Sequence, residues 1–314
     1  MLGVSTVNSR FKPAYSEDRD IRLRMAFQDF WQYAASSMRF LAMEGSVSDE
    51  FSGSYPIESR SGEIERLNVQ GLAMAPDTSR MLELIGVRDG WSCLDIGCGP
   101  GGITGLLSDF VGPSGRVVGL DLNAGFLEYA RSSAAANTEF VLGDAYGSGL
   151  PAETFDLVHM RFVASTAGEP ERLLQEAKRL AKPGGTIALQ EPDGSTLNCY
   201  PPHPSWEKLK AALLGAFSGV GADLELARRL YYIVCQADLA DVQFRPFVVG
   251  VRSMDPMVDY LPSTVESLRS VVLKLGLLDE NDFSETITTC REHLARPDTA
   301  FTMYTVAQVW SRKS

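Results

Sequence analysis

Hydrophobic positions recur with helical spacing in the first part of the chain. Apolar residues between Glu17 and Met43 return every three or four positions, which predicts a helix with one broad apolar stripe. A stretch rich in glycine and serine, 45–62, follows. The helical pattern then returns over 63–87, where we expect Pro76 to interrupt it.

Short apolar runs alternate with helical patterns in the middle of the chain. The runs bounded by turn residues are 91–97, 116–121, 139–144, 155–160 and 186–191. Strands of this length that alternate with helices predict βαβ units and a parallel sheet with right-handed crossovers.

The last third of the chain is less regular. Helical patterns cover 206–217, 224–234 and 254–296, and strand patterns cover 242–252 and 302–311. Because a helical stretch separates these last two strands, we expect them to form a hairpin-like pair at one edge of the sheet.

Composition and charge narrow the classes of partner. Hydrophobic residues make up 45% of the 314 residues and charged residues 22%, which is typical of a soluble globular protein. The net charge of −11 argues against nucleic acid and against an anionic membrane surface as partners. The five cysteines lack metal-ligand spacing, and no apolar run resembles a signal peptide or a membrane span. We therefore expect a cytoplasmic protein.

A glycine cluster follows the first predicted strand. The stretch LDIGCGPGG places Gly97, Gly99 and Gly101 between that strand and a helix. Ligands bind at the carboxyl ends of parallel strands, and glycine lets the backbone approach them closely. The spacing of Gly97, Gly99 and Gly102 also fits a dinucleotide fingerprint, so the glycines alone leave two kinds of nucleotide ligand open.

Acidic residues at three strand ends favour one of these ligands. Asp95 stands beside the glycines, where a carboxylate would repel a pyrophosphate and suit an ammonium group. Asp121 ends the second strand, at the position of a carboxylate that binds ribose hydroxyls. Asp144 ends the third strand and can accept a hydrogen bond from the adenine amine. Ammonium, ribose and adenine without a phosphate describe S-adenosylmethionine.

Residues 91–191 resemble the class I S-adenosylmethionine-dependent methyltransferases, and most closely their small-molecule, UbiE-like branch. The resemblance is carried by LDIGCGPGG, VVGLDLN, VLGDAYGSGLP, FDLVHMRFV and LAKPGGTIALQEPD, in the order typical of the family. It implies an α/β fold: a doubly wound seven-stranded sheet, mostly parallel with an antiparallel last strand, plus a helical cap. It also implies S-adenosylmethionine as cofactor.

The resemblance and the patterning together divide the chain into four parts. Residues 1–82 would form an N-terminal helical cap and a candidate oligomerisation segment, and 83–252 the Rossmann-like core. Residues 253–296 would complete the cap as a helical insertion, and 297–314 would add the final strand of the core.

The resemblance implies a set of cofactor-binding residues. The expected set is Tyr55, Gln70, Asp95, Gly97, Cys98, Gly99, Gly101, Asp121, Leu122, Asp144, Ala145 and Arg161. The glycines should wrap the methionine part, with Asp95 near its ammonium and Arg161 by its carboxylate or at the pocket floor. Tyr55 and Gln70 should close over the sulfonium.

The remaining members of that set should bind the nucleoside. Asp121 is expected to hold the ribose, and Leu122 to pack near the adenine. Asp144 and Ala145 should read the adenine edge.

Two residues are candidates for proton transfer, and each has a structural alternative. Glu191 ends the fifth strand, where a half-buried carboxylate could take a proton; it could equally be a rim carboxylate or a partner for Arg161. His159 is either a general base or a satisfied core histidine. A histidine that many relatives carry is absent from 164–170, and the sequence suggests no metal site.

These observations predict methyl transfer from S-adenosylmethionine to a small apolar or aromatic metabolite. The reaction would be an in-line displacement under a cap that excludes water. The alternatives are a cyclase or eliminase of the same fold, a non-catalytic methyltransferase-like subunit, and a dinucleotide enzyme. The expected partners are the small-molecule acceptor and a second copy of the chain bound through the N-terminal helix.

Overall fold

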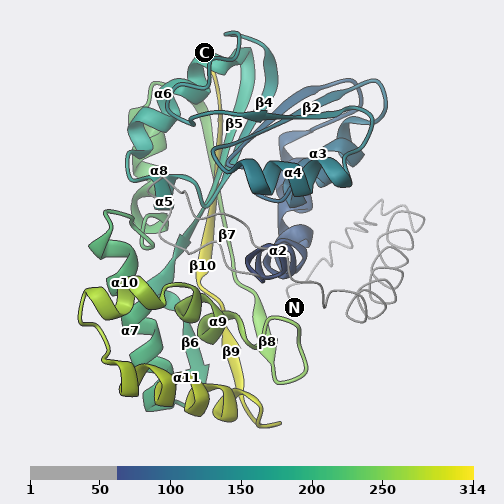
Figure 1. Cartoon of the computed structure of the whole chain (residues 1–314). Helices are drawn as coiled ribbons and strands as arrows, with labels where there is room; N and C mark the ends of the chain where they lie inside the picture. The colour runs from purple at the N-terminus through teal and green to yellow at the C-terminus, as the bar shows by residue number, and fades with distance from the viewer. Residues whose placement is uncertain (1–61) are drawn as a thin grey trace, which may run out of the picture. The chain divides into compact units, whose positions relative to one another are not determined.

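A seven-stranded sheet forms the centre of the computed structural model, which describes residues 62–314 (Figure 1). The strand order is β3–β2–β1–β4–β5–β10–β7. The strands are β1 (Ser92–Ile96), β2 (Arg116–Asp121), β3 (Thr138–Leu142), β4 (Phe155–Arg161), β5 (Ala181–Asp193), β7 (Ala240–Phe247) and β10 (Thr305–Arg312). β10 pairs antiparallel with both β5 and β7, and so runs opposite to the other six strands of this sheet. The predicted seven-stranded sheet with an antiparallel last strand is confirmed.

The order of the strands reverses between β1 and β4. The chain adds β2 and β3 on one side of β1, and then returns to add β4 and β5 on the other side. Asp95 of β1 lies directly opposite His159 of β4 in the register. Such a reversal opens a crevice at the carboxyl ends of the strands, which is where ligands bind in this type of sheet.

Helices cover both faces of the sheet. They are α2 (Glu63–Ile85), α3 (Gly102–Val111), α4 (Ala124–Ser132), α5 (Ala164–Ala167), α6 (Pro170–Leu180) and α8 (Ala227–Gln236). On one face Leu94 and Val158 pack in a core with residues of α6 and α8, such as Leu173. On the other face Cys93 and Leu157 pack with residues of α2 and α3. Side chains alternate along a strand, so Asp95 and His159 belong to the face covered by α2.

Helix α2 is continuous through Pro76, so the predicted interruption is wrong. Proline removes one hydrogen bond of the helix and costs roughly 3 kcal/mol. Residues on both sides of it, including Met74, Met81 and Leu82, are fully buried. Burial of several large side chains at about 1.5–3 kcal/mol each outweighs that cost. The domain boundary expected at 82/83 therefore falls inside a single helix.

The two late strand predictions each cover two strands. The segment 242–252 contains most of β7 and then β8 (Gly250–Arg252), and 302–311 contains the end of β9 (Ala300–Thr302) and most of β10. A second sheet, which is antiparallel, has the order β6–β9–β8, where β6 is Asn198–Tyr200. A short 3-10 helix, η1 (Gly194–Thr196), precedes it. The side chains of Cys199, Val251 and Phe301, one from each of these short strands, pack in a separate core.

That core belongs to a helical unit at the lower end of Figure 1. The unit contains α7 (Pro204–Gly219), α9 (Tyr260–Ser267), α10 (Arg269–Lys274) and α11 (Glu280–Leu294). Trp206 of α7 is fully buried in it, with its ring 4.9 Å from that of Phe301 in β9. The insertion expected at 253–296 thus packs together with a helix from the range expected to form the core.

Part of the predicted organisation lies outside the described residues. This applies to the helix between Glu17 and Met43, to the oligomerisation segment and to most of the expected cap at 1–82. Within 62–314, none of the helices has the length and apolar character needed to cross a membrane.

Candidate active site

The glycine loop connects β1 to α3 and leaves open space above it. Gly97 and Gly99 have φ values of 66° and 53°, in the left-handed region that favours glycine. A Cβ atom on Gly97 would lie 2.4 Å from a methyl carbon of Val163, so the loops after β1 and β4 pack directly together. A Cβ atom on Gly99 would meet nothing within 4 Å. The backbone at Gly99 is therefore open to a ligand.

Asp121, at the end of β2, shapes this loop from the side. One carboxylate oxygen accepts the N–H of Gly99 at 2.8 Å, and the other accepts the N–H of Asn123 at 2.8 Å. Burial raises the pKa of the Asp121 carboxyl, and these hydrogen bonds oppose the shift. Each oxygen has a second lone pair, so the carboxylate can still accept hydroxyl groups from a ligand.

Asp95 and Arg161 are oppositely charged side chains at the ends of neighbouring strands, and each has one buried atom without a hydrogen-bond partner. Asp95 is 2% exposed; its Oδ1 contacts His159 Nδ1 at 2.8 Å, and its Oδ2 is buried with no hydrogen bond. Arg161 ends β4, and its Nη1 is also buried with no hydrogen bond. Burial lowers the pKa of the Arg161 guanidinium, and the Asp95 charge opposes that shift. Unpaired buried groups of this kind cost free energy unless a ligand satisfies them.

The expected nucleoside-binding residues lie along the same edge of the sheet. Leu122, which follows β2, is 62% exposed, and Leu142, at the end of β3, is 58% exposed. Asp144 is exposed, and its Oδ1 accepts the N–H of Tyr146 at 2.9 Å. Ala145, which follows Asp144 in the sequence, is half-buried. Exposed apolar side chains beside a carboxylate suit a flat base with an exocyclic amine.

Two residues of the expected set, Cys98 and Gln70, have other surroundings. The Cys98 side chain is buried near Gly119, and its Sγ lies 3.7 Å from the Gly99 carbonyl oxygen; burial raises the pKa of the thiol. The Gln70 amide donates to Tyr304 Oη at 2.6 Å and to Tyr260 Oη at 3.2 Å. Tyr55 lies outside the described residues.

Glu191 is fully buried, so the expected half-buried position at the rim is wrong. Its two oxygens accept the N–H groups of Ala164 and Ser165, both at 3.0 Å. These are the first two residues of α5, so Glu191 caps the turn that follows β4. Burial raises the pKa of the Glu191 carboxyl to about 7, against the effect of these hydrogen bonds.

His159 is also fully buried, and both ring nitrogens have partners. Nδ1 contacts Asp95 Oδ1 at 2.8 Å, and Nε2 contacts the side-chain nitrogen of Gln190 at 2.9 Å. This arrangement corresponds to the satisfied core histidine that was weighed against a general base.

Sequence reasoning missed an aromatic group beside Arg161. Phe162 follows β4 with φ 61°, in the left-handed region that is uncommon for a bulky residue. Its ring meets Tyr304 edge-on at 5.6 Å, and the Tyr304 and Tyr260 hydroxyls are 3.0 Å apart. The motif FDLVHMRFV could have singled out Phe162, but the two tyrosines come from distant segments without a local signal.

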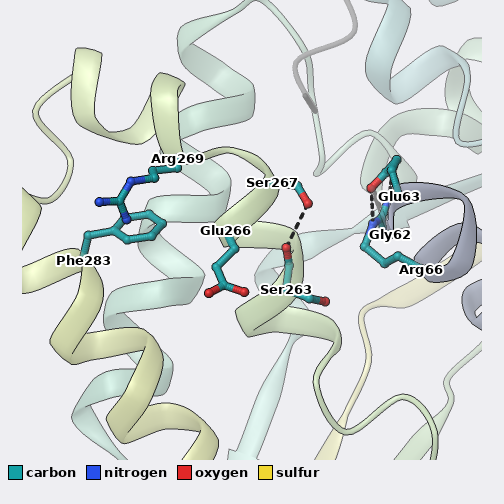
Figure 2. A pocket seen from close by; sticks show the side chains of 8 residues that line it. All are labelled: Gly62, Glu63, Arg66, Ser263, Glu266, Ser267, Arg269 and Phe283. Carbon is teal, nitrogen blue, oxygen red and sulfur yellow. Dashed lines mark hydrogen bonds and ion pairs between the residues drawn. The ribbon is translucent and has the colours of Figure 1, made fainter. Parts of the chain in front are cut away.

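A cavity of about 380 Å³ opens between the start of α2 and the helical unit (Figure 2). It is lined by Gly62, Glu63, Arg66, Ser263, Glu266, Ser267, Arg269 and Phe283. Glu63 and Arg66 form an ion pair at 2.7 Å, and Arg66 lies 5.9 Å above the Tyr260 ring. The cavity therefore adjoins the aromatic group, and four of its eight lining residues are charged.

Residues 62–314 contain no group of three or more His, Cys, Asp or Glu side chains that could hold a metal ion.

Comparisons with known proteins agree with this geometry. A model of the methyltransferase-domain family matches residues 94–189. The chain is 34% identical over 126 residues to a demethylmenaquinone methyltransferase of Lactococcus lactis, covering 39% of this chain and 50% of the relative. It is 37% identical over 111 residues to the ubiquinone/menaquinone biosynthesis C-methyltransferase UbiE of Hahella chejuensis, covering 34% and 45%.

Another relative carries no activity in its name. The chain is 37% identical over 126 residues to an uncharacterised 37.1 kDa transposon protein of Streptomyces fradiae, covering 39% of this chain and 36% of that protein. The chain thus spans half or less of the length of these curated relatives.

A solved structure supports the fold. A putative methyltransferase from Bacillus halodurans superposes with a TM-score of 0.51 at 16% identity, covering 76% of this chain and 99% of that one. At this identity the likeness shows the fold alone. Fold, glycine loop and family match agree: residues 94–189 of the chain carry a methyltransferase domain.

Proposed function

We propose that the protein transfers the methyl group of S-adenosylmethionine to a small-molecule acceptor. The observation that carries this proposal is the pair of unpartnered buried atoms, Asp95 Oδ2 and Arg161 Nη1. An α-amino acid presents an ammonium and a carboxylate side by side and would satisfy both atoms. A pyrophosphate would meet a negative charge at Asp95 instead, which disfavours the dinucleotide alternative.

The other residues at the sheet edge fit the rest of the cofactor. Asp121 would accept the ribose hydroxyls, Leu122 would pack on the adenine, and Asp144 with Ala145 would read its edge. When bound, the cofactor supplies a methyl group that is activated by the positive charge on its sulfur, and this sulfur is the leaving group. The protein then has to orient the acceptor about 3 Å from the methyl carbon and keep water out.

We propose further that the acceptor is apolar or aromatic and approaches from the side of Phe162 and Tyr304. Aromatic side chains next to Arg161 support this direction. The hydrogen bonds of Glu191 and His159 support structural roles for both residues. An acidic acceptor such as a phenol or enol would need only desolvation to react.

Binding of S-adenosylhomocysteine to Asp95→Asn tests the cofactor assignment. The amide removes the charge that faces the ammonium, so we expect the Kd from isothermal titration to rise about tenfold or more, since each factor of ten is about 1.4 kcal/mol. The matched control is Glu128→Asn on the exposed face of α4, which should bind normally. Unchanged binding by Asp95→Asn, or tight binding of reduced nicotinamide dinucleotide, would overturn the assignment.

Turnover then separates methyl transfer from the other reactions that this fold supports. The first acceptors to test are demethylated quinols, because two relatives are named for quinone methylation, followed by small phenols and enols. Methyl transfer yields S-adenosylhomocysteine, a released proton and an acceptor in which a methyl group has replaced one hydrogen. A changed acceptor without S-adenosylhomocysteine would favour cyclisation or elimination.

A further inference from the structure

Five polar side chains form one hydrogen-bonded chain across the sheet. They come from five strands that are neighbours in the sheet: Arg245 on β7, Gln308 on β10, Gln190 on β5, His159 on β4 and Asp95 on β1. Gln308, Gln190 and His159 are fully buried. This series of hydrogen bonds therefore reaches from the edge strand β7 to the Asp95 carboxylate beside the glycine loop, on the face of the sheet that α2 covers.

The contacts between successive members are short. Arg245 Nη1 lies 2.7 Å from Gln308 Oε1, and Gln308 Nε2 lies 2.9 Å from Gln190 Oε1. Gln190 Nε2 lies 2.9 Å from His159 Nε2, and His159 Nδ1 lies 2.8 Å from Asp95 Oδ1.

The chemistry of the two ends determines the direction of every bond. A guanidinium can only donate, so Gln308 must present its carbonyl to Arg245. The Gln308 amide group then donates to Gln190, and also to a backbone carbonyl of α2 at 3.0 Å. Gln190 in turn must donate to His159 Nε2, which leaves the ring proton on Nδ1. That proton is donated to Asp95, an acceptor when ionised.

We propose that His159 is a positioning residue that holds Asp95 so that its second oxygen faces the ammonium group of the cofactor. The proposal rests on the proposed function. Asp95 Oδ1 is held by the imidazole N–H, while Oδ2 is buried and has no partner. A neutral imidazole leaves the full negative charge on Asp95, whereas an imidazolium would offset it. Arg245, three strands away from His159, thus selects the tautomer on which the binding site depends.

The variant Gln190→Glu tests the direction of the hydrogen bond between Gln190 and His159. When it is ionised, the new carboxylate has no proton to offer His159 Nε2, so the ring must carry a proton there. His159 then becomes either an imidazolium, which offsets the Asp95 charge, or the neutral Nε2–H tautomer. In that tautomer the unprotonated Nδ1 faces the Asp95 carboxylate. Both states weaken the grip on an ammonium group, and neither changes the nucleoside site.

The measurement compares two ligands on the full chain by isothermal titration. S-adenosylhomocysteine carries the amino-acid group, and 5′-methylthioadenosine lacks it. For Gln190→Glu we expect the Kd of S-adenosylhomocysteine to rise about tenfold, while that of 5′-methylthioadenosine stays within about threefold. Equal weakening for both ligands, or no weakening for either, would overturn the proposal.

Thr78→Val is the matched control. Thr78 Oγ1 also donates to Gln190 Oε1, at 3.2 Å, and is fully buried. Removal of the hydroxyl leaves Gln308 as a donor to the same oxygen, so the direction of the hydrogen bonds across the sheet is kept. We expect both ligands to bind this variant as they bind the wild type.

A spectroscopic measurement on the wild type keeps the proposal testable even where a variant fails to fold. The chain has three histidines. With ¹⁵N-labelled histidine, the variants His203→Asn and His293→Gln assign two of the signals, and the third should show the neutral Nδ1–H tautomer. An Nε2–H tautomer or an imidazolium at neutral pH would contradict the inference.

Failure of this inference can be told apart from failure of the proposed function. If the wild type binds no S-adenosylhomocysteine, the proposed function falls. If Asp95→Asn loses S-adenosylhomocysteine selectively and Gln190→Glu does not, the cofactor assignment stands and the positioning role of His159 is wrong.

Discussion

At the scale of single residues, burial changes what a charged side chain can do. Asp95, Arg161 and Glu191 all lie near the carboxyl ends of neighbouring strands, yet only the first two keep an unpartnered buried atom. Glu191 uses both oxygens to cap α5. Three side chains that look alike in sequence as strand-end charges thus divide into a pair with unpartnered buried atoms and a structural cap.

Glu191 should make the stability of the protein depend on pH. Its folded pKa, about 7, lies above the ordinary value of 4.5, so the protonated carboxyl stabilises the folded state. This contribution is fully present below pH 4.5 and is lost as the pH rises through about 7. It amounts to roughly 3 kcal/mol at about 1.4 kcal/mol per pH unit.

The test compares urea unfolding of wild type and Glu191→Gln between pH 5 and pH 8. The amide cannot ionise, so we expect the unfolding free energy of the wild type to fall relative to this variant as the pH rises. The exposed Glu171→Gln should run parallel to the wild type. A constant difference between wild type and Glu191→Gln would show that the carboxyl keeps one protonation state throughout.

At the scale of elements, packing decides where helices and strands continue. Helix α2 passes through Pro76 because large side chains on both sides of the proline are buried. The apolar run at 242–252 divides instead, because Phe247 and Val251 contribute to the core of the helical unit from two different sheets. Local periodicity predicts that a segment is regular, but not whether the segment stays in one element.

Pro76→Ala should stabilise the protein. Pro76 is exposed, and alanine would restore the helical hydrogen bond that proline lacks. We expect the unfolding free energy to rise by about 1–3 kcal/mol, partly offset by the greater freedom of the unfolded chain. Arg80→Ala, at an exposed position of the same helix, should change it by less than about 0.5 kcal/mol. A loss of stability in Pro76→Ala would mean that the neighbouring contacts require a bend at this residue.

At the scale of the whole described part, the sheet and the helical unit have separate cores. The largest fully buried side chain of the helical unit is Trp206, which packs among residues of α7, α9, α11 and β9. The glycine loop, Asp95 and Asp121 belong to the sheet. Stability and cofactor binding should therefore respond to different substitutions.

Trp206→Phe tests this separation. The smaller ring leaves a cavity, and we expect the unfolding free energy to fall by about 1–3 kcal/mol. Binding of S-adenosylhomocysteine, measured well below the unfolding temperature, should stay within about twofold of the wild type. The exposed Tyr200→Phe serves as the control. A parallel loss of affinity in Trp206→Phe would show that the two cores act as one unit.

The sequence alone determined the parts of this protein that depend on neighbouring residues. Alternating apolar runs specify strands and helices, and the glycines with Asp95 and Asp121 mark a ligand edge, because strand ends and tight turns are local features. Only the tertiary structure decided how distant side chains meet. Arg245, Gln308 and Gln190 carry no signal in the sequence, since a hydrogen-bonded chain across five strands depends on strand order and register. The same reason explains why Glu191 proved to be a cap and His159 a partner of Asp95.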